Sequence, residues 1–321
     1  MTPPTGGPRL AAALSTTVAD PATWLLGAAG FLARGGVILM ALPIATLPSP
    51  VGIASLIGPR ILDTGRLAGP ALAAAAMLFL ILVALFALAL FIAAWIDAVL
   101  FERHLADPET GRGRAASPTP PSTGRPIGAL VGAQVAALLP ALAAGTVTLG
   151  GIVAAVRQEI LLPGDLAVPL ALRALSAAGG PVLLLGGSLL LAEALNGVLS
   201  RRVLLRGRPR GGALAAGAVA RRLVGIAVTA FVGWVVALTV LLPSLAFLLV
   251  AWEGVRDAWL AGAVGGFARP GAVVLAVATT LLFVALWIAV LALAGLVSAF
   301  RASLWTERAT WAAGDWTAGG D

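Results

Sequence analysis

The chain has 321 residues, of which 60% are hydrophobic and only 11% are charged, and its mean hydropathy is +1.02. A soluble domain carries about 25% charged residues, so this composition excludes an ordinary soluble fold and indicates that lipid is the main solvent. The formal net charge is +7, and every one of the 21 basic residues is arginine. Because these arginines fall in short segments between apolar runs, they indicate charge that sets membrane orientation rather than nucleic-acid binding.

The first apolar stretch, PATWLLGAAGFLA, is 13 residues long and lies between Asp20 and Arg34. Crossing the hydrocarbon core takes about 20 residues, so we expect an interfacial helix over residues 20–33. The next 25 residues, up to Arg60, carry no charge. They contain the proline-rich run LPIATLPSP, which predicts a short, broken first span.

Five further uncharged windows follow in chain order, and each is long enough to cross a membrane. They lie between Arg66 and Asp97 (30 residues), Arg125 and Arg157 (31), Arg173 and Glu193 (19), Arg222 and Glu253 (30), and Arg269 and Arg301 (31). The sequence therefore predicts an all-α fold, a polytopic membrane helix bundle of six transmembrane helices in three hairpins plus short interfacial helices. Residues 1–321 form one integral membrane domain in this interpretation.

The connections predict the orientation of the bundle. With six spans, 15 of the 21 arginines fall on one side of the membrane. The positive-inside rule then places both termini in the cytoplasm. The lack of lysine, together with many Ala, Gly and Pro residues, is typical of a GC-rich bacterial genome, so we expect a bacterial inner-membrane protein.

Three segments on the cytoplasmic side have distinct compositions. Residues 106–125 are rich in Pro, Ser, Thr and Gly and predict a flexible loop, and residues 201–222 form the most basic loop. Residues 305–321 hold three tryptophans, which favour the headgroup level, so we expect an interfacial tail. The basic loop carries either ordinary inside-positive charge or a lipid-headgroup site, and the candidate headgroup contacts are Arg201, Arg202, Arg206, Arg221 and Arg222.

A candidate intramembrane polar site comprises Glu193, Asn196 and Asp97. Glu193 lies eight residues before Arg201, about 12 Å along a helix, and Asn196 shares its helix face. Asp97 lies at a matching depth in the second span. An intramembrane carboxylate should face protein or water, so these residues form either a proton or cation site or a bundle contact that holds helices in register.

The glycines of the third and fourth spans predict close helix packing or, alternatively, an unwound binding segment. They are Gly128, Gly132, Gly179, Gly180, Gly186 and Gly187.

Catalytic motifs are nearly absent from the sequence. There is one histidine and no cysteine, and no GxSxG, GxGxxG or P-loop pattern occurs. We therefore expect no enzymatic activity, no cofactor and no metal site.

The six-span layout, the interfacial segment before the first span and FRASLWTER (Phe300–Arg308) together resemble a family. The chain resembles uncharacterised six-helix bacterial membrane proteins similar to the membrane domain of some glycerophosphodiester phosphodiesterases. The catalytic domain of those enzymes has no counterpart here, so the resemblance implies a membrane fold without hydrolase activity.

We expect a non-enzymatic scaffold that contacts membrane lipids or a protein partner; the alternative is a transporter or permease subunit with a polar site near Glu193 and Asp97. Transport needs several polar groups converging near the midplane. The candidates are Gln134, Thr146, Thr148, Ser188, Thr279 and Thr280.

Overall fold

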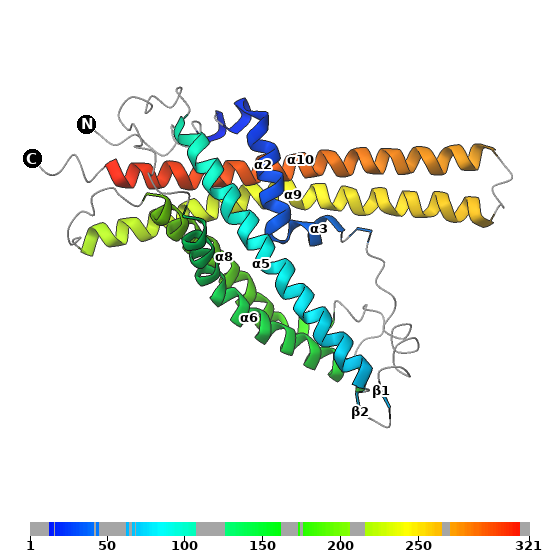
Figure 1. The fold of residues 1–321 in the computed structure, drawn as a ribbon. Coiled ribbons are helices and arrows are strands. Elements are labelled where there is room, and N and C mark those ends of the chain that lie inside the picture. Colours follow the sequence, from blue (N-terminus) through cyan, green and yellow to red (C-terminus); the bar gives the residue numbers. More distant parts are fainter. Residues whose placement is uncertain are drawn as a thin grey trace, which may run out of the picture. The chain divides into compact units, whose positions relative to one another are not determined.

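A computed structural model of the chain describes residues 13–15, 17–41, 43–44, 62–63, 66–67, 69–106, 126–161, 173, 176–205, 216–264 and 270–314. These residues are helical almost throughout (Figure 1). The strands among them, β1 (Leu62–Asp63) and β2 (Arg66–Leu67), have two residues each and pair antiparallel. The predicted all-α fold class is confirmed.

Five long helices each cover most of one of the predicted uncharged windows. They are α5 (Gly69–Ala106), α6 (Ile127–Leu161), α8 (Gly179–Leu204), α9 (Ala216–Val264) and α10 (Pro270–Gly314). With the segment Pro21–Ala41, six helical segments of the described residues are long and apolar enough to cross a membrane. The six-helix membrane architecture expected from the sequence is thus confirmed by length and composition.

The first of these segments differs from the predicted first span, because it begins at Pro21 and continues through Arg34. It is broken near that arginine. Helix α2 (Pro21–Phe31) passes through a π-helical turn, η1 (Leu32–Gly36), into α3 (Val37–Ala41), and Gly35 has a φ of 95°, which favours glycine. The predicted interfacial helix 20–33 ends at this break, and most of the predicted first span, up to Arg60, lies outside the described residues.

The chain divides into two compact units. Unit 1 comprises residues 1–16, 97–235 and 300–321, and unit 2 comprises residues 17–96 and 236–299. Helices α5, α9 and α10 therefore contribute residues to both units.

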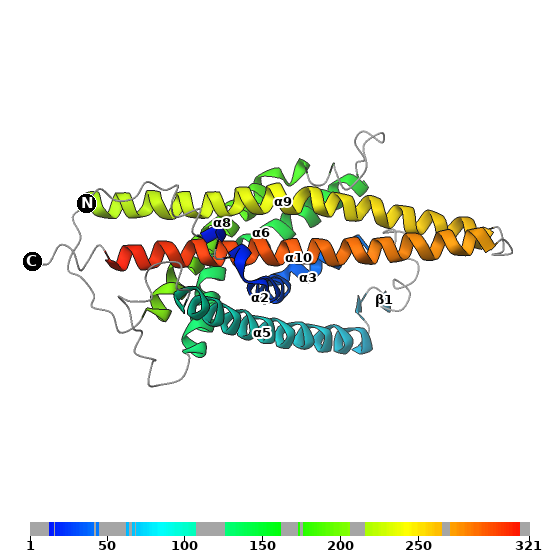
Figure 2. The same cartoon turned by 90° about the horizontal axis from the view of Figure 1, so that it is seen from above.

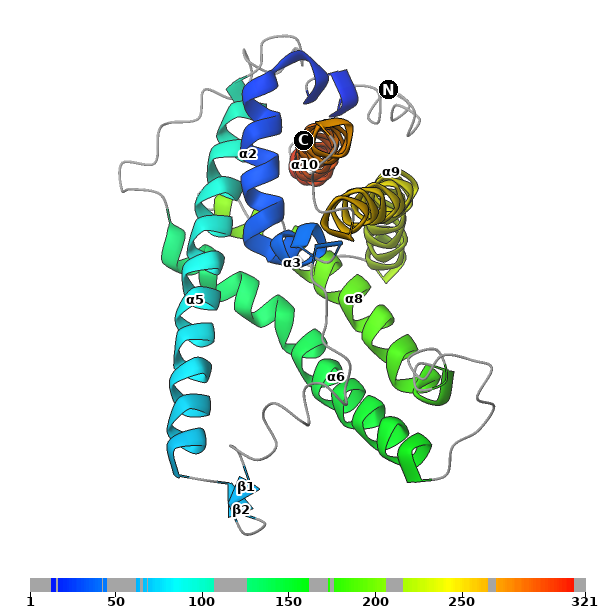
Figure 3. The same cartoon turned by 90° about the vertical axis from the view of Figure 1, so that its right-hand side faces the viewer.

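In unit 2, α2 runs across α10 rather than alongside it (Figures 1 and 3). Two glycines meet at this crossing. A Cβ atom on Gly27 would collide with the carbonyl oxygen of Gly295, and one on Gly295 would collide with the carbonyl oxygen of Trp24. The helix backbones touch here, which only small residues permit.

The rest of unit 2 is organised around the paired helices α9 and α10, which run side by side (Figure 2). A buried cluster joins them to α3 through Met40, Leu248, Val255, Phe283 and Val290. The indole Nε1 of Trp287 donates a hydrogen bond to the carbonyl oxygen of Met40 at 3.0 Å, which fixes the segment after the break against α10.

In unit 1, α6 packs against α8 at a point set by a proline. The hydroxyl of Thr148 donates to the carbonyl oxygen of Pro181 at 2.7 Å. A Cβ on Gly151 would lie 3.0 Å from the Pro181 ring, so glycine permits this approach.

The glycines singled out from the sequence do not mark the close helix approaches among the described residues. No atom of another side chain or helix lies within 4 Å of a Cβ built on Gly128, Gly132, Gly179, Gly180, Gly186 or Gly187. The prediction of close packing at these positions is wrong. A GxxxG spacing permits a close approach but does not identify the neighbour that makes one.

Candidate functional site

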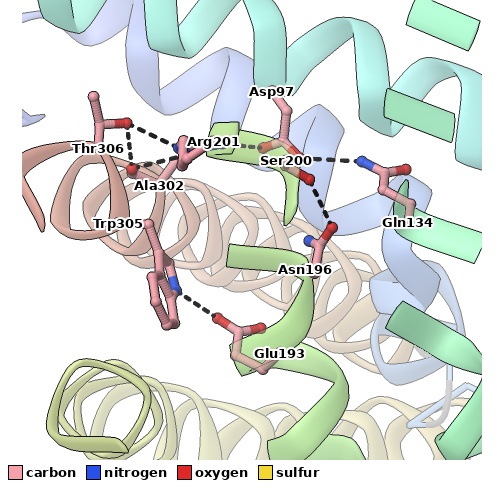
Figure 4. A network of polar contacts seen from close by, with 9 residues as sticks. All are labelled: Asp97, Gln134, Glu193, Asn196, Ser200, Arg201, Ala302, Trp305 and Thr306. Carbon is pink, nitrogen blue, oxygen red and sulfur yellow. Dashed lines mark hydrogen bonds and ion pairs between the residues drawn. The ribbon is translucent and has the colours of Figure 1, made fainter. Parts of the chain in front are cut away.

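The C-terminal end of α5 carries a buried carboxylate that meets α6 and α8. Gln134 Nε2 of α6 donates to Asp97 Oδ2 at 3.1 Å, and Arg201 NH1 of α8 lies 3.9 Å from Asp97 Oδ1 (Figure 4). All three residues are buried, with 3% of Asp97, 4% of Gln134 and 4% of Arg201 exposed. Burying these charges is tolerable only because they are paired and hydrogen-bonded.

Arg201 also binds the end of α10. Its Nε donates to Thr306 Oγ1 at 3.1 Å, its NH2 donates to the carbonyl oxygen of Ala302 at 3.1 Å, and its guanidinium lies 5.9 Å from the centre of the Phe101 ring. A guanidinium this buried is not available to a lipid headgroup, which corrects the sequence-based assignment of Arg201. Arg202 is exposed, whereas Arg206 and the side chains of Arg221 and Arg222 lie outside the described part of the chain.

Glu193 belongs to a second part of the same polar region. Its Oε2 lies 2.6 Å from NH2 of Arg301, and its Oε1 accepts a hydrogen bond from Trp305 Nε1 at 3.3 Å. Both members of the ion pair are partly exposed, with 23% of the Glu193 side chain and 22% of the Arg301 side chain accessible. The indole of Trp305 packs on Gly197, where a Cβ would come within 2.7 Å of ring atom Cε3.

Asn196 takes a local role. Its Oδ1 accepts a hydrogen bond from the Ser200 hydroxyl, one helical turn further along α8, at 2.9 Å. The structure thus brings the predicted residues Asp97, Glu193 and Asn196 into one region (Figure 4), in which Asp97 meets Gln134 and Arg201 while Glu193 meets Arg301 and Trp305.

The FRASLWTER segment of α10 lies at the centre of this region, and its polar side chains contact α5, α8 and α9. Glu307 Oε1 lies 2.8 Å from Nε2 of His104 on α5, and Arg308 NH1 donates to Thr229 Oγ1 of α9 at 3.4 Å. Thr306 is 1% exposed and Glu307 3% exposed. We use the name α10 hub for the contacts made by Arg301, Trp305, Thr306, Glu307 and Arg308.

The structure of the α10 hub also corrects the prediction that residues from Trp305 onward form an interfacial tail. Residues 305–314 continue α10, and Trp305 is only 6% exposed, so its indole packs inside unit 1 rather than facing lipid headgroups. The side chain of Trp311 and all of Trp316 lie outside the described residues.

The remaining midplane candidates bond to nearby backbone instead of converging. Thr146 and Ser188 donate to carbonyl oxygens three residues earlier, and Thr279 and Thr280 donate to carbonyl oxygens within four residues. Thr148 bonds Ala144 and Pro181. Of the candidates named from the sequence, Gln134 joins the predicted carboxylates.

Sequence reasoning missed the hub residues, although FRASLWTER contains a signal. Its polar side chains at Arg301, Thr306, Glu307 and Arg308 surround the helix on several sides directly after 31 uncharged residues. A helix that is polar on several faces has to meet partners on several faces.

Among the described residues, no group of three or more His, Cys, Asp or Glu side chains is placed to hold a metal ion. The unit 1 site consists of paired charges, amides, hydroxyls and indoles.

Comparisons with family models, with curated proteins and with solved structures found no match to this chain. The similarity to the membrane domain of glycerophosphodiester phosphodiesterases therefore stays a prediction. The fold itself defines the class: six apolar helical segments identify a multi-pass α-helical membrane protein.

Proposed function

We propose that this chain is a non-enzymatic scaffold of the bacterial inner membrane, with both termini in the cytoplasm. In this proposal the site in unit 1 is a fixed contact between helices, and the scaffold holds a protein partner or lipids against it. One observation carries the proposal: each carboxylate of the site faces a basic side chain on another helix. The pairs are Asp97 with Arg201 at 3.9 Å, Glu193 with Arg301 at 2.6 Å, and Glu307 with His104 at 2.8 Å.

Carboxylates paired in this way suit a fixed contact between helices better than a transport path. An unpaired charge in a membrane span costs about 2.5–3.5 kcal/mol on insertion scales, and breaking a buried pair costs about 3–5 kcal/mol. A transport cycle would have to break and remake such contacts, whereas a scaffold keeps them. The scatter of the threonine and serine candidates supports the same conclusion.

The alternative, a transporter or permease subunit, is favoured by one feature. Gln134 joins Asp97 in a buried position, and its Oε1 is buried without a hydrogen-bond partner in the structure. A proton or cation carried at Asp97 would make use of that oxygen.

Proton uptake by the reconstituted chain separates the two functions. The scaffold proposal expects vesicles containing the wild type, Asp97→Asn or Glu253→Gln to take up protons no faster than empty vesicles under an imposed gradient. Glu253 is a matched control, since its ion pair with Arg256 is exposed. Uptake by the wild type that disappears only in Asp97→Asn would overturn the scaffold proposal in favour of transport.

A further inference from the structure

Two nitrogen donors at the Glu193–Arg301 pair are buried with no acceptor among the described residues. They are Nε of Arg301 and Nε1 of Trp234 on α9. The Arg301 guanidinium carbon lies 5.3 Å from the centre of the Trp234 ring, so both N–H groups belong to one stacked pair. A buried donor left unsatisfied costs about 1–3 kcal/mol, which favours any oxygen that reaches them.

The Arg301 side chain lies over the α9 backbone at Gly233. A Cβ on Gly233 would lie 3.5 Å from Cγ and 3.7 Å from Nε of Arg301, which is ordinary van der Waals contact. The aliphatic part of Arg301 is therefore next to the α9 backbone as well as to the indole of Trp234.

The local charge decides the type of acceptor. Arg301 is already neutralised by Glu193 at 2.6 Å, and a free anion would be repelled by that carboxylate. Two N–H donors in a locally neutral site suit an uncharged oxygen, such as a carbonyl.

The surroundings decide where that oxygen comes from. Arg301 follows 31 uncharged residues, more than the about 20 that cross the hydrocarbon core, so we expect it at the headgroup end of the span. Phe231, one turn before Trp234, is 68% exposed, and Leu190, one turn before Glu193, is 45% exposed. Exposed apolar side chains on α9 and α8 indicate that lipid covers the face of unit 1 beside the Glu193–Arg301 pair.

We propose that Arg301 and Trp234 bind an ester carbonyl oxygen of a glycerolipid, because such carbonyls lie at the headgroup end of a membrane span. Both nitrogens are covered by protein atoms in this conformation, so the oxygen enters as the partly exposed Arg301 side chain shifts. The inference rests on the proposed scaffold function, since it presumes a surface that retains lipid.

Native mass spectrometry of the full chain tests the site with two lipids that share a headgroup. The probes are dioleoyl phosphatidylglycerol and its ether-linked analogue, which lacks both ester carbonyls. The wild type is expected to retain the ester lipid about three- to tenfold better, the effect of about one net hydrogen bond. This comparison needs no variant.

Trp234→Phe keeps the ring under the guanidinium and removes one donor, so it should reduce that preference severalfold. Trp259→Phe is the matched control, because the Trp259 Nε1 already donates to Thr280 at 3.0 Å, and it should leave the preference unchanged. Equal retention of both lipids, retention of neither, or an ester preference that survives Trp234→Phe would each overturn the assignment. These outcomes do not bear on proton uptake, so a failure here is distinguishable from a failure of the scaffold proposal.

Discussion

At the scale of single residues, the buried arginine of α8 contrasts with its neighbour. Arg201 binds Thr306, Ala302 and Asp97, while Arg202 is exposed. Arg201→Met should lower the free energy of unfolding by about 3 kcal/mol, because it removes the basic partner of a buried carboxylate. Thermal unfolding in detergent measures the effect, and Arg202→Met is the control. Equal midpoints for the two variants would contradict the buried role of Arg201.

A second residue-scale contrast concerns glycines of α8. A methyl group at Gly197 would overlap the Trp305 ring, whereas nothing lies within 4 Å of a Cβ at Gly187. Gly197→Ala should therefore destabilise the chain by about 1–3 kcal/mol through overpacking. Gly187→Ala should stabilise it by about 0.5–1 kcal/mol, since alanine favours the helix. The thermal midpoints check both signs, and a stabilising Gly197→Ala would disprove the close contact with Trp305.

At the scale of elements, the crossing of α2 over α10 depends on backbone contact. The atoms that a Cβ on Gly27 would meet are the carbonyl oxygen of Gly295 and the amide nitrogen of Ala299. Backbone atoms move less readily than side-chain ends, so Gly27→Ala should cost about 3 kcal/mol, at the upper end of overpacking effects. Gly254→Ala in α9, with nothing within 4 Å, is the matched control. If both variants unfold at the same temperature, α2 does not cross α10 as described.

The long helices were predictable because charge is costly in lipid. An uncharged window of sufficient length therefore indicates a span from its own composition, whichever helices it packs against. Asp97 and Glu193 stood out for the same reason. Which residues they pair with was not predictable, because Gln134 lies 37 residues from Asp97 and Trp305 lies 112 residues from Glu193. Which helices meet is decided by tertiary packing, and nothing in the local pattern of either helix encodes it.

At the scale of the whole molecule, the number of crossings depends on the first apolar region. If the region 21–60 crosses once, the chain crosses six times and its termini share one side. If this region crosses twice, there are seven crossings and the termini lie on opposite sides. The break at Arg34 and Gly35 leaves α2 with 11 residues, about 16 Å of helix, which favours a single crossing in this region.

The chain has no cysteine, so single introduced cysteines report the topology without background labelling of native cysteines. Thr5→Cys, Ser117→Cys and Ala318→Cys should react with a membrane-impermeant maleimide in inverted vesicles and stay protected in spheroplasts. Asp165→Cys, in a connection that the proposed topology places outside, should show the reverse pattern. Arginine asymmetry gives the physical reason, because arginine-rich connections stay on the cytoplasmic side. Labelling of Thr5→Cys from outside with Ala318→Cys labelled from inside would establish seven crossings, and labelling of Ser117→Cys from outside would invert the orientation.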